Sequence, residues 1–117
     1  MRIGIDLVEH KDIMYKDERF IKRVLSSQEF EIYSSFTNFS RRVEYLASRF
    51  ACKEAIIKCF PEKESINFCE ISILNKKNGA PYALIYNEEV ELQISLSHTD
   101  NYSVAIAILP SSDDDLE

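Results

Sequence analysis

Two carboxylates far apart in the sequence lie where ionised groups are costly to bury. Asp6 stands in the apolar stretch Gly4-Ile5-Asp6-Leu7, and Glu54 stands in Phe50-Ala51-Cys52-Lys53-Glu54-Ala55-Ile56. Because an unpaired charge there loses its hydration, each carboxylate needs a cationic partner. A few hard oxygen ligands drawn from distant segments are typical of Mg²⁺, which completes its shell with water and phosphate oxygens. The pair indicates a shared magnesium site, with an ordinary ion pair as the alternative for each carboxylate.

Basic side chains surround Glu54 at helical spacing. Lys58 follows Glu54 by four residues, so the two share one face of a helix, and Arg49 and Lys53 share an adjacent stripe. We interpret the three basic residues as a cationic wall suited to a phosphorylated ligand. The alternative is a plain surface ion pair between Glu54 and Lys58, worth about 0.2–0.5 kcal/mol.

Two further segments carry weaker signals. His98 stands at the end of a predicted strand, in Ser95-Leu96-Ser97-His98-Thr99. Strand ends are favoured places for ligand contacts, although a lone histidine is more often structural. Asn78-Gly79-Ala80-Pro81 is first of all a turn, whose glycine also allows a ligand to approach the backbone. Neither the histidines nor the cysteines have the spacing of zinc ligands.

The elements that must position these residues follow from hydrophobic periodicity. A capping box, Ser26 to Glu29, starts a short helix that runs to about residue 36, and Asn78-Gly79 joins two strands as a hairpin. The full set of predicted elements is a strand over 2–8, helices over 18–25, 27–36 and 41–59, and strands over 69–75, 81–86, 92–97 and 102–109. This order predicts an α+β fold in which a mostly antiparallel sheet packs on one long helix, as a single domain.

Composition narrows the class of protein. The chain has 117 residues and a net charge of −6, and a net negative charge argues against generic nucleic-acid binding. No apolar run is long enough to span a bilayer, and the start does not resemble a signal peptide. Three cysteines without a CxxC pair favour a reducing cytoplasm. We expect a folded domain over residues 1–110 and an acidic, disordered tail over 111–117.

Four blocks together resemble the holo-acyl-carrier-protein synthase family, the group I 4′-phosphopantetheinyl transferases. In chain order they are Gly4-Ile5-Asp6-Leu7-Val8-Glu9, the block from Arg49 to Lys58, Asn78-Gly79-Ala80-Pro81-Tyr82 and Ser95-Leu96-Ser97-His98-Thr99. The resemblance covers nearly the whole chain and implies the 4′-phosphopantetheinyl transferase fold. It also implies transfer of the 4′-phosphopantetheine group of coenzyme A to a serine of apo-acyl-carrier protein, with release of adenosine 3′,5′-bisphosphate.

The resemblance also assigns roles to residues of the site. Asp6 and Glu54 are implied to bind Mg²⁺ on the coenzyme A diphosphate, with Lys58 completing the catalytic set. The residues implied to contact coenzyme A are Arg49, Lys53, Lys58, Gly79, Pro81, His98 and Thr99. The base that takes the serine proton stays open between Glu54, a metal-bound water and a deprotonated Lys58.

Partners follow from the same resemblance. It implies a homotrimer with active sites between subunits, one chain supplying the Asp and its neighbour the long-helix residues. Acidic carrier proteins would dock on a basic helix after the first strand, through Lys16, Arg19, Lys22 and Arg23. Asp12 departs from the basic residue that relatives often carry there. Two alternatives remain at this stage: a non-catalytic coenzyme A or nucleotide-binding module, and a purely structural trimeric protein.

Overall fold

The computed structural model describes residues 1–61 and 66–111. Strand β1 spans Arg2–Glu9 and is followed by the short 3-10 helix η1 (His10–Asp12). The other elements of the structure are, in chain order, α1 (Glu18–Val24), α2 (Ser27–Ser35), α3 (Phe39–Lys58), η2 (Phe68–Glu70), β2 (Ile71–Asn75), β3 (Pro81–Ile85), β4 (Glu88–Val90), β5 (Gln93–His98) and β6 (Tyr102–Leu109). The predicted helices and strands are all present, and the Ser26 capping box is formed in full. The predicted acidic tail falls on residues that are almost entirely outside the described part.

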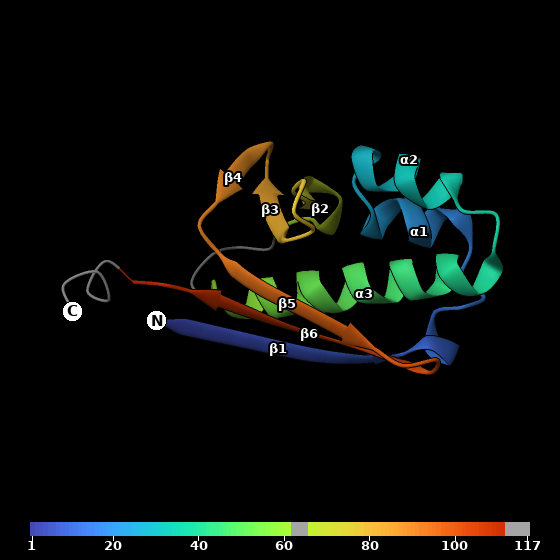
Figure 1. The fold of residues 1–117 in the computed structure, drawn as a ribbon, viewed down its shortest axis with the longest axis horizontal. Coiled ribbons are helices and arrows are strands. Elements are labelled where there is room, and N and C mark those ends of the chain that lie inside the picture. The colour runs from blue at the N-terminus through green and yellow to red at the C-terminus, as the bar shows by residue number, and fades with distance from the viewer. Residues whose placement is uncertain (62–65, 112–117) are drawn as a thin grey trace.

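Helix α3 forms the middle layer of the fold (Figure 1). On one side it packs against a three-stranded antiparallel sheet of order β1-β6-β5. Helices α1 and α2 and a second antiparallel sheet, β2-β3-β4, lie on the other side. The strands therefore form two sheets, whereas the sequence indicated one. Strand β4 was not predicted, because its acidic residues Glu88 and Glu89 are not typical of a strand, although they pair with β3.

Small residues face α3 from the β1-β6-β5 sheet. Ser103, Ala105 and Ala107 are buried, and Gly4 pairs with Ala107 in the β1–β6 register. This small-residue face lets the helix approach the strands closely. The buried core is built around that contact.

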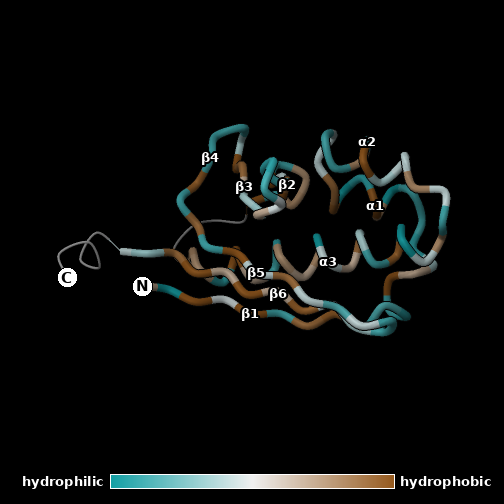
Figure 2. The backbone as a smooth tube through the Cα atoms, in the orientation of Figure 1, coloured by the Kyte–Doolittle hydropathy of each residue, from teal (hydrophilic) through white to brown (hydrophobic). Residues whose placement is uncertain are grey.

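The other face of the same sheet is apolar and uncovered. Ile3, Ile5 and Leu7 of β1 are between 54% and 62% exposed. Their register partners on β6 are Ile108, Ile106 and Val104. Figure 2 shows these hydrophobic stretches running along β1 and β6. Such a contiguous apolar surface marks an interaction face.

No helix within the described residues is long and apolar enough to cross a membrane.

Candidate functional site

Asp6 and Glu54 line the same pocket, although 48 positions of sequence separate them. The pocket has a volume of about 480 Å³ and lies between β1, η1, α1 and α3. Asp6 comes from the middle of β1 and Glu54 from the last third of α3. We call it the carboxylate pocket; its lining also includes Asp12, Ile13, Lys16, Phe20 and Phe50.

Gly4 allows the two carboxylates to meet. A Cβ at this position would lie 1.8 Å from the backbone oxygen of Ala55 and 3.1 Å from the Cβ of Lys58. Only a residue without a side chain permits β1 to approach α3 this closely. Because Gly4 lies two residues before Asp6 and faces the residue after Glu54, it fixes the distance between the strand and the helix at the site.

We therefore expect Gly4→Ala to destabilise the protein and to lower its activity. The added methyl group meets helix backbone, which cannot move aside as a flexible side chain can, so β1 must shift. Overpacking of this kind costs about 1–3 kcal/mol or more. Chemical unfolding measures the loss of stability.

Gly79→Ala is the comparison for this change. Among the described residues no atom would lie within 4 Å of the methyl group added at Gly79, and only the φ of 89° opposes the substitution. Equal stability of Gly4→Ala and the unchanged protein would contradict the packing argument.

Lys58 connects the strand and the helix through polar contacts. Its Nζ donates a hydrogen bond to the backbone oxygen of Ile5 at 2.7 Å and lies 3.6 Å from Oδ1 of Asp6. The Asp6 side chain is 22% exposed, whereas that of Lys58 is 51% exposed. Lys58 is thus anchored beside Asp6 while its ammonium group remains accessible to a phosphate.

The two carboxylates repel each other electrostatically. Burial raises the pKa of Glu54 above its usual range, and the Asp6 carboxylate adds to the increase, while Lys58 opposes it. An upward shift means that the ionised form of Glu54 is under-stabilised by its surroundings. A divalent cation between the two carboxylates would relieve this cost.

The donor set fits Mg²⁺ better than zinc. Within residues 1–61 and 66–111 no group of three or more His, Cys, Asp or Glu side chains could hold a metal ion. Two carboxylates leave most of a coordination shell to water and to phosphate oxygens, which suits Mg²⁺. Asp6 and Glu54 are the residues that would hold it.

Four of the other residues assigned to coenzyme A gather in a second pocket. Arg49, Gly79, Pro81 and His98 line a pocket of about 510 Å³ between α3, β5 and the β2–β3 hairpin. We call it the arginine pocket. Three residues that sequence reasoning missed also line it: Arg41, Glu44 and Tyr45.

Charges in the arginine pocket are held in place by one another. His98 Nε2 lies 3.2 Å from Oε1 of Glu44, which also pairs with Arg41. The Arg49 guanidinium packs over the Tyr45 ring at 4.2 Å. Arg41, Tyr45 and Arg49 recur every four residues on α3, so their helical spacing was the signal that could have revealed them.

The two pockets belong to opposite edges of one sheet. Asp6 is on β1 and His98 on β5, and β6 lies between these strands. The expectation that Asp6 and the long-helix carboxylate come from different chains is wrong, because a single chain brings Asp6 and Glu54 to one pocket. Within one chain, the carboxylate pocket and the arginine pocket are separate from each other.

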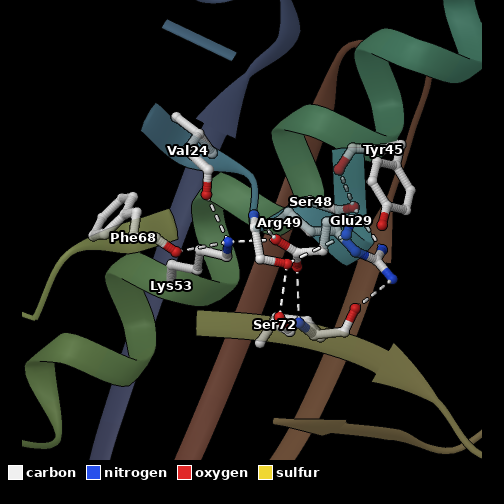
Figure 3. A network of polar contacts seen from close by, with 10 residues as sticks. Val24, Glu29, Tyr45, Ser48, Arg49, Lys53, Phe68 and Ser72 are labelled. Atoms are coloured by element: carbon white, nitrogen blue, oxygen red, sulfur yellow. Dashed lines mark hydrogen bonds and ion pairs between the residues drawn. The ribbon is translucent and has the colours of Figure 1, made fainter. Parts of the chain in front are cut away.

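Lys53 does not belong to the cationic wall that the sequence predicted for binding phosphate. Its side chain is fully buried, and its Nζ donates to the backbone oxygens of Val24 and Phe68 and to Glu29 Oε1, at 2.6, 2.9 and 2.5 Å (Figure 3). The three donors of the ammonium group are therefore all used inside the protein. The prediction of Lys53 as a ligand residue is corrected: it is a buried structural cation.

Thr99 also has a local role. Its hydroxyl accepts hydrogen bonds from the backbone N–H groups of Asn101 and Tyr102, at 3.2 and 3.1 Å. It caps the turn between β5 and β6 and does not line the arginine pocket. The basic residues predicted for docking, Lys16, Arg19, Lys22 and Arg23, are all exposed on or beside α1.

Comparisons with known proteins agree on one family. The family model of the 4′-phosphopantetheinyl transferase superfamily matches residues 2–107. A holo-[acyl-carrier-protein] synthase of Onion yellows phytoplasma is 40% identical, covering 92% of this chain and 91% of the relative, and one of Petrotoga mobilis is 36% identical, covering 95% and 97%. A crystal structure of a holo-(acyl-carrier-protein) synthase from Bacillus anthracis in complex with CoA (3′,5′-ADP) superimposes with a TM-score of 0.84 at 31% identity, covering 95% of this chain and 96% of that one.

Proposed function

The chain belongs to the 4′-phosphopantetheinyl transferase superfamily, and we propose that its carboxylate pocket carries out the transfer chemistry. The reaction is that of its curated relatives: the 4′-phosphopantetheine group of coenzyme A passes to a serine of apo-acyl-carrier protein. The serine hydroxyl gives its proton to a base and its oxygen forms a bond to phosphorus. The bond from phosphorus to the bridging diphosphate oxygen breaks, and adenosine 3′,5′-bisphosphate leaves with the electron pair of that bond. The observation that carries the assignment of the site is the meeting of Asp6 and Glu54 in one pocket beside Lys58.

Each residue of the carboxylate pocket has a physical task. Asp6 and Glu54 would hold Mg²⁺, which would supply charge neutralisation at the diphosphate. Lys58, fixed by the Ile5 carbonyl, presents a positive charge to the phosphate oxygens. Phosphoryl transfer depends mainly on positioning and charge stabilisation, so these three groups account for the catalytic set.

The arginine pocket is suited to the nucleotide end of coenzyme A. Arg41 and Arg49 supply fixed guanidinium groups, which are strong partners for phosphate. His98 and Pro81 line the same pocket, and Gly79 leaves open space there. Thr99 and Lys53 have no part in this proposal.

Trimer formation would join the two pockets. The carboxylate pocket lies at the β1 edge of the sheet and the arginine pocket at the β5 edge, so a head-to-tail ring would place one beside the other. The uncovered apolar face of β1 and β6 supports such an assembly. We propose a homotrimer in which coenzyme A spans the carboxylate pocket of one chain and the arginine pocket of its neighbour.

Ile5→Lys tests the assembly, because it places a charge in the middle of the apolar face. We expect light scattering to show monomers where the unchanged protein forms trimers. Transfer activity should fall by about a hundredfold or more, as expected when half of an electrostatic site is lost. Tyr86→Lys, at a position that is 56% exposed on another part of the surface, should change neither. A monomeric unchanged protein with full activity would contradict the proposal.

The activity itself is tested by mass spectrometry. The protein is mixed with Mg²⁺, coenzyme A and apo-acyl-carrier protein of Staphylococcus carnosus, the source of a 38% identical relative. The carrier should gain one phosphopantetheine group, and it should not do so when a chelator removes the metal. An unmodified carrier, repeated with carriers from Geobacillus and Petrotoga, would contradict the proposed function.

A further inference from the structure

Two exposed aromatic rings stack on each other outside both pockets. Tyr15 lies in the loop between η1 and α1 and is 85% exposed, and Phe39, the first residue of α3, is 53% exposed. Their ring centroids are 6.2 Å apart with an interplanar angle of 26°. Single exposed apolar side chains are normal, but two stacked rings from different elements form a continuous apolar surface.

The stack lies beside the entrance to the carboxylate pocket. Ile13 and Lys16, which flank Tyr15 in the sequence, both line that pocket. A carrier protein whose serine reaches Asp6 and Glu54 must cover the rim of the pocket. The loop that carries Tyr15 forms part of this rim, so the covering protein comes close to the stack.

The charge next to the stack is positive. In the described part of the chain, Lys16, Arg19 and Arg23 are exposed and form no ion pair. Of the nearby carboxylates, Asp17 is the N-cap of α1 and Glu18 forms an ion pair with Lys22 at 3.8 Å. Asp12, which is exposed and lines the carboxylate pocket, is a single carboxylate set against these three cations, so the local charge is net positive. The surface is therefore complementary to a partner that presents carboxylates beside an exposed apolar side chain.

We propose that the Tyr15–Phe39 stack is an apolar contact for the apo-carrier protein, next to the basic face of α1. This inference rests on the proposed function, because the carrier is the partner that the reaction requires. Rigid aromatic side chains with an apolar face are the residues most often found at the energetic centre of protein interfaces. The basic residues speed and orient the encounter, and the stack slows dissociation.

The test uses Tyr15→Ala, Phe39→Ala and the double variant in the full-length protein. We expect each single change to raise KM for Staphylococcus carnosus apo-carrier about tenfold, the effect of losing about 1.4 kcal/mol of binding. The KM for coenzyme A and the kcat at saturating carrier should stay unchanged. Tyr86→Ala, which removes an exposed ring in the turn between β3 and β4, is the matched control.

Salt separates the aromatic contact from the charges. Screening at high ionic strength should reduce the effect of Arg19→Ala on KM for the carrier, whereas the effect of Tyr15→Ala should persist, because apolar contacts are not screened. Unchanged carrier KM in the double variant would overturn the proposal. An equal increase in KM for coenzyme A, or a change of subunit number in light scattering, would also overturn it.

A protein without transfer activity can be told apart from a protein without the proposed docking surface. If the unchanged protein transfers nothing, calorimetry with apo-carrier measures binding directly. Binding that the double variant weakens about tenfold or more supports the docking surface without the activity. An unchanged protein that does not bind apo-carrier overturns the docking surface as well.

Discussion

Glu54→Gln is expected to reduce kcat for phosphopantetheine transfer by about a thousandfold, with the fold intact. Removing one preorganised charged group from a site of this kind costs about 10²–10³ in rate. The substitution keeps the size of the side chain and removes its charge, so the Asp6 carboxylate is left alone to hold Mg²⁺. It also removes a charge whose burial, together with repulsion from Asp6, raises the pKa of Glu54, so the variant should be no less stable than the unchanged protein.

Two measurements make this prediction specific. Initial rates of carrier modification report kcat, and calorimetric titration with Mg²⁺ in the presence of coenzyme A reports the metal. Glu44→Gln is the matched control, since it removes a carboxylate of the same helix that lines the arginine pocket. It should weaken coenzyme A binding without abolishing metal dependence. A Glu54→Gln variant with normal rate and normal metal affinity would refute the role assigned to Glu54.

Lys53→Met is expected to destabilise the protein by about 3–5 kcal/mol, the usual cost of leaving one member of a buried ion pair without its partner. Lys53 and Glu29 are both fully buried. Glu29 also accepts hydrogen bonds from the backbone N–H groups of Ser26 and Ile73, at 2.9 and 2.8 Å. The network therefore joins α1, α2, η2 and β2 to α3, and its loss should loosen α1, the helix that carries the proposed docking charges.

Denaturant unfolding measures this loss, and a second substitution identifies its cause. In the double variant Lys53→Met with Glu29→Met no buried charge remains at this pair, so it should be destabilised by less than the sum of the two single variants. Lys22→Met, which breaks the exposed pair with Glu18, should cost less than about 1 kcal/mol. At denaturant concentrations below its unfolding transition, Lys53→Met should bind coenzyme A normally. A raised KM for coenzyme A would instead indicate that Lys53 contacts the ligand.

Local signals were sufficient to predict most elements from the sequence. The capping box at Ser26, the helical periodicity of residues 41–59 and the Asn78-Gly79 turn each involve residues close in the chain. These signals predicted α2, α3 and the β2–β3 hairpin close to where they lie in the structure. The apolar surroundings of Asp6 and Glu54 suggested a shared site, and the resemblance to the family supported it. Both residues lie in one pocket, although 48 positions separate them.

Contacts between distant elements could not be predicted in the same way. The pattern around Lys53 is the same for a basic side chain that faces solvent and for one that is paired inside the core with Glu29, 24 positions earlier. The close approach of Gly4 to Ala55 depends on how a strand crosses a helix. Residues that alternate along a strand share a face, so Ile3, Ile5 and Leu7 lie together on β1. Only the packing of α3 on the opposite face shows that theirs is left uncovered.

Subunit mixing tests most directly whether Asp6 and Glu54 act from the same chain. Asp6→Asn and Glu54→Gln subunits are unfolded together, refolded, and assayed as mixed oligomers isolated through two different affinity tags. We predict that they remain as inactive as either variant alone, because no chain in the mixture has both carboxylates. Mixed oligomers of Glu54→Gln with Arg49→Ala subunits should regain activity, since an intact carboxylate pocket then meets an intact arginine pocket of its neighbour. Recovery of activity in the Asp6→Asn and Glu54→Gln mixture would contradict the account and place the two carboxylates on different chains.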